Sequence, residues 1–316
     1  MATDATPALA IAPCGLGIDA GGTQTRWALA NASGEIIASG HVAGLTALQM
    51  STDGGRQHIR EVLNGLALNV RAHGQPASVY AGLTGFSEGG ENLCALIADA
   101  LGVNVSTVRL GSDVEIAYLD LYAPGEGIVV YAGTGSIAAF IDKDGTLHRA
   151  GGRGVLLDDA GGGYWIAQEA LRHIWRGEDE HPGQWQDSPM ACEIFARIGG
   201  GEWAHTRQFV YGATSERARG KIGKLALAVA ASADFDPVAR GILVGAGEEL
   251  ARLGLALTAR FGPLPITLSG RVADLHPVIA ESMRAALPES VLFQVKTSDA
   301  HFAAARIAAN ALAGRR

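Results

Sequence analysis

The sequence predicts an α/β protein built from two similar domains, and three observations support this fold class. The first third of the chain reads as three strands followed by alternating helices and strands. A strand–loop–strand pattern starts again after the turn-forming segment 123–125. Glycine-rich loops follow apolar strands in both halves. The chain has 316 residues, 48% of them hydrophobic, which is enough for two separate cores.

Apolar runs and turn residues define the first domain, which we expect over residues 1–122. Residues 15–20 form a short strand that ends in an acid and glycines, and 26–31 and 35–41 form a hairpin. Apolar side chains at helical spacing predict a helix over 55–72. These side chains are Ile59, Val62, Leu63, Leu66 and Val70. The remaining elements of this domain are strands at 78–83 and 107–111 and helices at 91–101 and 113–121.

The second domain, expected over residues 123–299, repeats the opening pattern. Strands are predicted at 127–131, 136–142 and 147–150, with a turn signal at 142–145. Later elements are mostly helical. Helices are expected at 164–175, 190–198, 220–233, 237–259 and 276–286, and strands at 265–269 and 291–295. A last helix is expected at 300–313, after this domain.

Composition excludes several classes of protein. The formal net charge of −7 and the lack of a basic run argue against a nucleic-acid partner. The three cysteines are isolated, so neither a disulfide framework nor a zinc site is expected, and a cytoplasmic location fits. Residues 1–13 read as a loose tail rather than a signal peptide. The longest apolar run, 225–233, is too short to span a membrane.

Three glycine-containing loops follow apolar strands and suggest phosphate binding. Glycine makes up 43 of the residues, near twice the usual ~7%. A nucleotide phosphate needs converging N–H donors, and a Cβ would hold the backbone away from it. Taken singly, each loop is more simply a tight turn, but three of them at strand ends favour a nucleotide. The candidate residues are Gly21, Gly22 and Thr23, then Gly133, Thr134, Gly135 and Ser136, and finally Ser269 and Gly270.

Two acids follow strands of the first domain. Asp19 would repel a phosphate, so its useful role is to hold Mg²⁺ through water, the alternative being a turn-forming residue. Asp113 lies between a strand and a helix, where it can be a helix N-cap. The same carboxylate can also accept the proton of an attacking hydroxyl. A P-loop is absent, and the GxGxxA pattern at 15–20 is the strand itself rather than a dinucleotide fingerprint.

Residues 151–165 form the most unusual stretch of the chain. Six glycines stand there beside Arg153 and two adjacent acids, the second of which is Asp159. This composition is poor material for a core and suits a polar pocket that hydrogen-bonds sugar hydroxyls. The apolar triplet 155–157 and the pair Tyr164 and Trp165 are expected to pin the loop. The alternative is a flexible surface loop.

Six segments occur in the order DAGGTQT, SDVEIA, AGTGS, GGRGVLLDDAGGGYW, LSGRVADL and SDAHFAA. Together they resemble the BadF/BadG/BcrA/BcrD ATPase family, and more closely its N-acetylglucosamine and glucosamine kinase members. The resemblance covers residues 15–313. It implies two ribonuclease-H-like domains of the actin-like ATPase superfold, with the active site in the interdomain cleft and helix 300–316 completing the first domain. It also implies ATP and Mg²⁺ as cofactors, an amino sugar phosphorylated at its 6-hydroxyl, and a homodimer.

The resemblance also implies roles for single residues. Asp113 matches the catalytic aspartate, Ser269 and Gly270 the adenosine-side loop, and Thr84, Gly85 and Asp159 the sugar contacts. Several positions depart from the family pattern. Ala20 replaces a glycine, Arg153 stands where some members carry tryptophan, Arg271 follows a loop that is usually a double glycine, and the asparagine expected around 46–47 is missing. N-acetylglucosamine, glucosamine and a different sugar therefore all remain open.

Other functions in related folds fit the sequence less well. ATPases that activate radical reductases carry a cysteine just before AGTG, where this chain has Val130 and Tyr131. A sugar-sensing regulator would need a DNA-binding segment, and residues 1–13 are too short to form one. The cysteine-rich zinc motif of ROK-type kinases is absent.

Overall fold

The structure is a computed structural model that describes residues 13–86, 89–212 and 215–313, and it divides into two compact units. Unit 1 comprises Met1–Asp120 and Asp299–Arg316, and unit 2 comprises Leu121–Ser298. Each unit holds one five-stranded sheet and an apolar core. Most of the tail expected at 1–13, and the last three residues of the segment 300–316, lie outside the described residues.

The sheet of unit 1 is mixed and has the strand order β3-β2-β1-β4-β5. The central strand β1 runs antiparallel to β2 and parallel to β4, and β5 continues the parallel part. The strands are β1 (Cys14–Ala20), β2 (Gln24–Ala30), β3 (Ile36–Ala43), β4 (Pro76–Leu83) and β5 (Val108–Ser112). The helices are α1 (Asp53–Arg71), α2 (Glu91–Leu101), α3 (Asp113–Leu121) and α11 (Ala300–Ala313), with short 3-10 turns at Ala47–Ser51 and Val105–Thr107.

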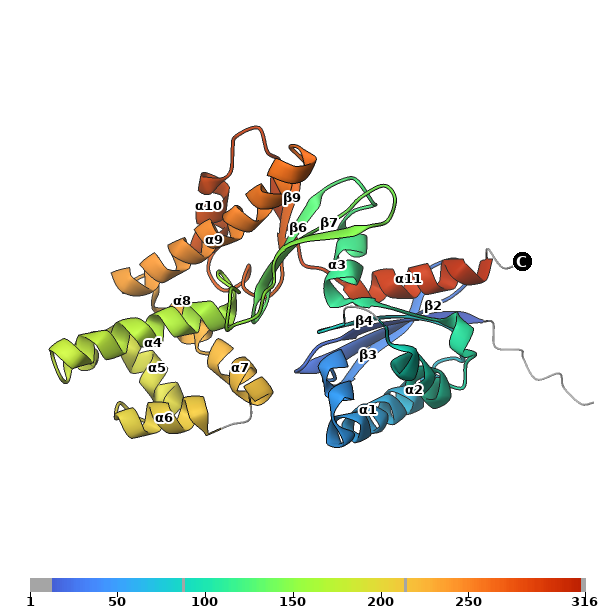
Figure 1. Cartoon of the computed structure of the whole chain (residues 1–316), viewed down its shortest axis with the longest axis horizontal. Coiled ribbons are helices and arrows are strands. Elements are labelled where there is room, and N and C mark those ends of the chain that lie inside the picture. The colour runs from blue at the N-terminus through green and yellow to red at the C-terminus, as the bar shows by residue number, and fades with distance from the viewer. Residues whose placement is uncertain (1–12, 87–88, 213–214, 314–316) are drawn as a thin grey trace, which may run out of the picture. The chain divides into compact units, whose positions relative to one another are not determined.

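Helices cover both faces of this sheet. Figure 1 shows α1 and α2 on one face and α11 on the other, and α11 contacts β1, β2 and β4. The five apolar residues that predicted the helix at 55–72 are all buried in α1, which confirms their helical spacing. Thr52 begins α1, where its side-chain oxygen accepts a hydrogen bond from the Gly55 N–H.

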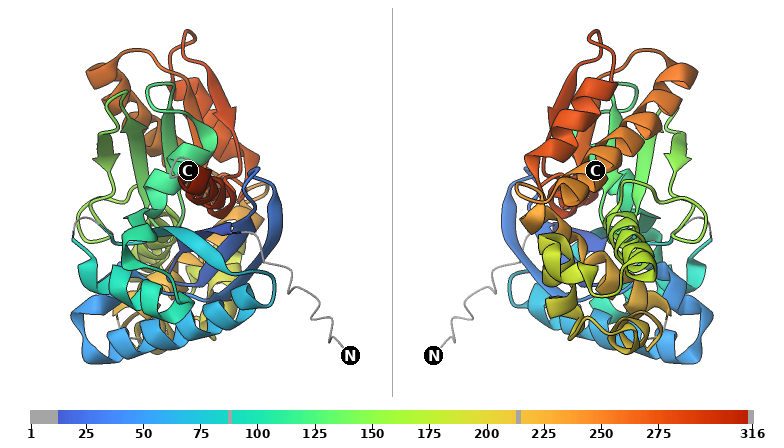
Figure 2. Two further views of the ribbon diagram at one scale, coloured as in Figure 1. Left: turned by 90° about the vertical axis from the view of Figure 1, so that its right-hand side faces the viewer. Right: turned by 90° about the vertical axis from the view of Figure 1, so that its left-hand side faces the viewer.

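Two glycines of β1 let α11 lie directly on the sheet. A Cβ at Gly15 would stand 2.1 Å from the backbone nitrogen of Ala309, and one at Gly17 would stand 2.1 Å from the carbonyl oxygen of His301. Figure 2 views α11 along its axis beside the blue strands of unit 1. Because no side chain intervenes, the helix backbone rests on the strand backbone, and a larger residue at either position requires the helix to move.

The sheet of unit 2 repeats the topology of unit 1. Its order is β8-β7-β6-β9-β10, with β6 antiparallel to β7 and parallel to β9, so the two units have the duplicated pattern predicted from the sequence. The strands are β6 (Ile128–Ala132), β7 (Ser136–Ile141), β8 (Leu147–Gly151), β9 (Ile266–Ser269) and β10 (Phe293–Val295). The helices are α4 (Gly163–Glu180), α5 (Pro189–Ile198), α6 (Trp203–Tyr211), α7 (Ser215–Gly223), α8 (Ala226–Ser232), α9 (Pro237–Phe261) and α10 (Pro277–Ala286), with a 3-10 turn at Gln184–Asp187.

The helices of unit 2 differ from the prediction at two places. The helix expected at 220–233 is two helices, because α7 ends at Gly223 and α8 begins at Ala226. Glycine is a weak helix former, and the buried Leu225 occupies the break. Helix α6 was not predicted at all. Only Thr206 and Phe209 of α6 are buried, so the segment lacks the apolar repeat that would have indicated a helix.

None of the helices within the described ranges is long and apolar enough to cross a membrane. The longest, α9, has 25 residues, and glycines and charged residues interrupt its apolar positions.

The close contact between β1 and α11 predicts a large effect for Gly17→Ala. We expect this change to lower the free energy of unfolding by about 1–3 kcal/mol or more, because the new methyl group meets helix backbone. Gly65→Ala is the matched control, since a Cβ at this position in α1 has nothing within 4 Å. It should leave stability unchanged or raise it by about 0.5–1 kcal/mol. Urea unfolding measures both changes, and equal midpoints for the two variants would contradict the packing described here.

Candidate functional site

Three parallel strands of unit 1 place polar side chains at one edge of the sheet. Asp19 is near the carboxyl end of β1, Thr84 follows β4, and Asp113 follows β5. The strand ends are in register, because Ala20 pairs with Leu83 in the parallel ladder and the Thr84 N–H donates to the Ala20 carbonyl over 2.9 Å. The edge formed by the carboxyl ends of parallel strands is where open α/β sheets bind ligands.

The Asp113 carboxylate is held by two hydrogen bonds. The Thr84 hydroxyl donates to Oδ2 over 2.6 Å, and the Val114 N–H donates to Oδ1 over 2.9 Å. The N-cap interpretation of Asp113 is wrong. The residue before it, Ser112, fills that role by accepting a hydrogen bond from the Glu115 N–H, and Asp113 is already in the first turn of α3. The half-buried carboxylate is thus oriented without capping the helix.

Asp19 forms an ion pair with Arg26 of the neighbouring strand. Arg26 donates from Nη2 and Nε to Oδ2 of Asp19, over 2.6 and 3.2 Å. Burial raises the pKa of the Asp19 carboxyl. The Arg26 charge opposes this shift, and the negative charge of Asp113 adds to it. This side chain is 16% exposed, so it can meet a ligand only along one side.

The acids at this edge of the sheet do not form a metal site by themselves within the described ranges. Within the described ranges, no group of three or more His, Cys, Asp or Glu side chains could hold a metal ion. Mg²⁺ usually keeps several waters and binds through one or two carboxylates together with substrate phosphates. A single partly exposed carboxylate such as Asp19 fits this arrangement.

The turn between β1 and β2 leaves space beside its glycines. The Gly21 N–H donates to the Gln24 carbonyl over 3.1 Å, which closes the turn. A Cβ at Gly21 or Gly22 would make only ordinary contacts, at 3.4 and 3.6 Å. A residue that sequence reasoning missed, Gly44, lies against this turn, where a Cβ would stand 2.5 Å from the Gly22 carbonyl carbon. Gly44 belongs to no recognisable motif.

The corresponding turn of unit 2, between β6 and β7, is anchored to helix α4. The carbonyls of Gly133 and Thr134 accept hydrogen bonds from the N–H groups of Gly163 and Tyr164, each over 2.9 Å. The buried Ser136 hydroxyl donates to the Ala160 carbonyl over 2.5 Å. The predicted phosphate loop and the predicted sugar loop are therefore bonded to each other within unit 2.

The two glycines of this turn have different surroundings. Within the described part of unit 2, a Cβ at Gly133 would have only Tyr131 Cε1 nearby, at 3.6 Å, so these residues leave this side open. A Cβ at Gly135 would lie 2.3 Å from Asp159 Oδ2 and 2.8 Å from Arg219 Nη2. Gly133 thus has the free space that a ligand requires, whereas Gly135 makes room for side chains of the protein itself.

Asp159 is buried and paired with an arginine that the sequence analysis did not identify. The two residues join over 2.9 Å between Oδ2 and Nη2 of Arg219, and the Gly154 N–H donates to Oδ1 over 3.0 Å. Burial raises the pKa of the Asp159 carboxyl, and the charge of Arg219 opposes that shift. Arg219 lies in α7, 60 positions from its partner and outside every glycine motif, so only the fold reveals the pair.

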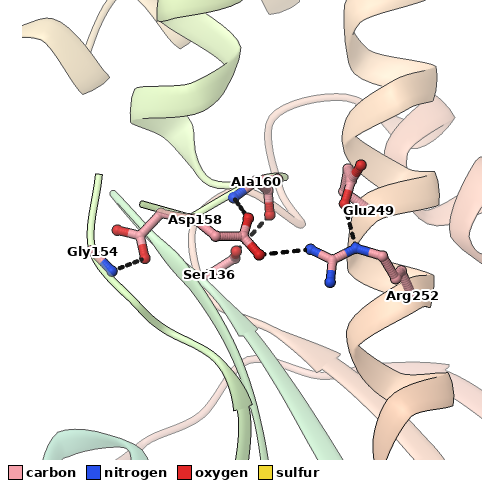
Figure 3. Close-up of polar contacts among 7 residues, drawn as sticks. Ser136, Gly154, Asp158, Ala160, Glu249 and Arg252 are labelled. Atoms are coloured by element: carbon pink, nitrogen blue, oxygen red, sulfur yellow. Dashed lines mark hydrogen bonds and ion pairs between the residues drawn. The ribbon is translucent and has the colours of Figure 1, made fainter. Parts of the chain in front are cut away.

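The predicted pinning of the glycine-rich loop by its apolar triplet is wrong. Leu156 and Leu157 are 94% and 82% exposed, because the loop turns outward there. Polar contacts fix the loop instead. Figure 3 shows the Asp158 carboxylate between the Ala160 N–H, at 3.2 Å, and the guanidinium of Arg252 in α9, at 3.0 Å. Tyr164 and Trp165 do pack on the unit 2 core, as expected. Arg153 is exposed.

The remaining site glycines adopt backbone conformations that other residues rarely use. Gly85 has φ +77°, and Gly270 has φ +98° with the Ala132 carbonyl oxygen 2.4 Å from where its Cβ would be. The hydroxyl of Ser269, which precedes Gly270, is buried and has no hydrogen-bond partner among the described residues. The loop after β9 is therefore tightly packed against the end of β6.

The strand order common to both units, with a glycine turn between the first two strands of each, defines an actin-like ATPase fold of two ribonuclease-H-like units. Solved structures share it. A candidate N-acetylglucosamine kinase from Porphyromonas gingivalis matches with a TM-score of 0.75 at 18% identity, over 94% of this chain and 99% of that one. A candidate N-acetylglucosamine kinase from Chromobacterium violaceum matches with a TM-score of 0.71 at 23% identity, over the same shares of the two chains.

The chain belongs to the BadF/BadG/BcrA/BcrD ATPase family, whose model matches residues 16–305. A relative by sequence is the N-acetyl-D-glucosamine kinase of Dictyostelium discoideum. It is 27% identical over 177 residues, which are 52% of this chain and 55% of that protein. The match thus spans about half the length of the relative.

The helix that packs on β1, α11, carries a buried histidine. His301, in the first turn of α11, is 7% exposed, and its Nδ1 has no hydrogen-bond partner in the described part of the chain. Burial lowers the pKa of His301 to about 4, and the positive charge of Arg26 contributes to this shift. His301 is therefore neutral at neutral pH, which keeps a second positive charge away from Arg26.

This histidine predicts that the protein loses stability in mild acid. The unfolded chain takes up a proton at His301 near its ordinary pKa of 6.5, while the folded chain resists protonation down to about 4. The free energy of unfolding should therefore fall as pH falls from 6.5 to 4, by up to about 3 kcal/mol from this group. His301→Asn should flatten the pH dependence in that window, and the exposed His173→Asn should not. Identical slopes for His301→Asn and wild type in urea unfolding would refute this assignment.

Proposed function

We propose that this protein is an ATP-dependent kinase that phosphorylates a hydroxyl group of an amino sugar, either N-acetylglucosamine or glucosamine. The observation that carries the proposal is the Asp113 carboxylate, which Thr84 and the Val114 N–H orient at the carboxyl edge of the sheet. Membership of an ATPase family supports the nucleotide, and the similarity to proteins described as N-acetylglucosamine kinases supports the sugar.

The glycine turns are assigned to the nucleotide. In this proposal the turns at 21–23 and 133–135 bind phosphate oxygens through the N–H groups of Gly22, Thr23, Thr134 and Gly135, and Thr23 and Thr134 add hydroxyl donors. The N–H groups of Gly21 and Gly133 instead close their own turns, by donating to the carbonyls of Gln24 and Gly135. The open space beside Gly21, Gly22 and Gly133 supports this assignment. Ser136 closes the second loop, and Ser269 and Gly270 stand on the adenosine side. Mg²⁺ brought by ATP would neutralise phosphate charge, with Asp19 holding it through water.

Asp113 is assigned as the general base. Each carboxylate oxygen can accept more than one hydrogen bond, so both oxygens keep acceptor capacity beside Thr84 and Val114. The carboxylate would receive the proton of the acceptor hydroxyl as the oxygen of that hydroxyl attacks the terminal phosphorus of ATP. The bond between this phosphorus and the bridging oxygen breaks, and ADP leaves. The Thr84 hydroxyl, 2.6 Å from Oδ2, fixes the direction of the remaining acceptor positions. We place this reaction in the cytoplasm, where ATP is abundant.

We assign the contacts with the sugar to four residues, which are Thr84, Gly85, Arg153 and Asp159. Asp159 can only accept hydrogen bonds when ionised and suits sugar hydroxyls, whereas the exposed Arg153 can only donate. A protonated glucosamine needs an acid closer to its nitrogen than Arg153 is. The neutral N-acetyl group of the other sugar can accept a hydrogen bond from arginine. Turnover with each sugar under the same conditions decides between them.

Asp113→Asn should remove phosphorylation while preserving nucleotide binding. The amide keeps the size and the contact with Thr84 but cannot take the proton, so we expect turnover to fall by ~10²–10⁴. Asp99→Asn, which changes an exposed acid of α2, should retain wild-type turnover and serves as the control. A folded Asp113→Asn protein that keeps more than about a tenth of wild-type turnover excludes the general-base role.

Thr134→Val should impair the use of ATP more than the use of sugar. The Thr134 methyl group faces Gly223, where a Cβ would lie 3.2 Å away, so valine preserves the packing and removes only the hydroxyl. We expect the KM for ATP to rise about three- to tenfold, the effect of one lost hydrogen bond, with the KM for the sugar nearly unchanged. Thr146→Val, on an exposed turn of the same unit, is the control. An unchanged KM for ATP together with unchanged turnover would remove Thr134 from the site.

A further inference from the structure

Arg219 lies next to the loop between β6 and β7. Its Nη2 would stand 2.8 Å from a Cβ at Gly135, so the guanidinium lies against the loop backbone. The same helix, α7, also contacts the loop through Gly223, where a Cβ would be 3.2 Å from Thr134 Cγ2. Helix α7 therefore lies along residues 134 and 135 and contributes the arginine to the side of the predicted phosphate loop.

The hydrogen-bonding capacity of Arg219 is only partly used. One nitrogen, Nη2, donates to Asp159 over 2.9 Å. Another, Nε, is shielded from solvent and has no acceptor among the described residues. A buried donor on a charged group that lacks an acceptor is unfavourable by a few kcal/mol, so such atoms usually mark a position where a water, ion or ligand belongs. The side chain as a whole is still 38% exposed, which leaves the guanidinium accessible.

The type of side chain fits a phosphate. Arginine presents several N–H donors in a planar fork that matches phosphate oxygens, and its positive charge strengthens each bond. Asp159 offsets the single positive charge of Arg219 but uses only one nitrogen of the guanidinium, so N–H donors remain for phosphate oxygens. A phosphate on the open side of Gly133 would lie beside Thr134, which α7 contacts directly.

We propose that Arg219 binds a phosphate of the nucleotide held by the loop at 133–135 and, through its ion pair, holds Asp159 in position at the same time. This inference rests on the proposed nucleotide site and adds a residue that no motif indicates. Its consequence is a direct chemical link between the nucleotide loop and the glycine-rich loop predicted to contact the sugar. The competing role is purely structural, in which Arg219 only orients Asp159.

Binding of the ATP analogue AMPPNP and of ADP, measured by calorimetry without sugar, separates these roles. Arg219→Gln should weaken AMPPNP binding about tenfold or more, the effect of losing a charged hydrogen bond. Arg219→Lys, which keeps the charge without the fork, should fall between wild type and Arg219→Gln. Arg252→Gln is the matched control. Arg252 pairs with Asp158 on the same glycine-rich loop and with Glu249 of its own helix, so its change should leave both affinities within about twofold of wild type.

Each outcome is decisive. If wild type binds neither AMPPNP nor ADP, the proposed function itself fails. If wild type binds them and Arg219→Gln binds both as tightly as Arg252→Gln does, Arg219 contacts no phosphate and the inference is overturned. Should Arg219→Gln not fold, Arg219→Lys and Asp159→Asn together provide the second test. Asp159→Asn breaks the ion pair yet leaves the arginine, so AMPPNP affinity should be kept. Arg219→Lys should bind AMPPNP more weakly than Asp159→Asn does, and equal affinities of these two variants would establish the purely structural role and overturn the inference.

Discussion

The rest of unit 1 depends on two glycines of its central strand β1, Gly15 and Gly17, which have no side chain. Gly15 and Gly17 allow α11 to rest on β1 at backbone contact distance. β1 pairs with both β2 and β4, so the position of α11 fixes the sheet that carries Asp19, Thr84 and Asp113 to a common edge. The catalytic geometry proposed here therefore rests on two residues that touch no ligand.

Glycine serves two purposes in this molecule, and the structure separates them. At Gly21, Gly22 and Gly133 the protein leaves space next to the backbone, as a ligand loop requires. At Gly135 and Gly270, other protein atoms fill the space that a Cβ would occupy. These atoms belong to the Asp159–Arg219 ion pair at Gly135 and to the Ala132 carbonyl at Gly270. The high glycine content of the sequence thus reflects close packing within the protein as much as the ligand binding that we propose.

Most helices and strands could be predicted from the sequence, because apolar periodicity and turn residues that lie close together in the chain determine them. Helix α2 was predicted with its true bounds, and the strands were predicted to within a few residues. The residues that escaped prediction depend on partners far along the chain. Arg219 meets Asp159 only after α7 folds against the loop at 133–135, and Gly44 meets Gly22 only once β3 has paired. The exposure of Leu156 and Leu157 was not predicted, because their apolar character suggested burial. Hydrogen bonds to Asp158 and Asp159 hold that loop instead.

The placement of α11 also sets an order of events during synthesis. A ribosome releases the chain from its amino end, so every residue of unit 2, a continuous segment from Leu121 to Ser298, emerges before α11 does. Unit 2 is therefore synthesised before the helix that completes unit 1. The backbone of β1 at Gly15 and Gly17 is covered by α11 only after the residues of that helix, Ala300–Ala313, have been synthesised. Unit 1 thus joins two segments that are far apart in the chain and depends on the arrival of α11, whereas unit 2 is drawn from one continuous segment.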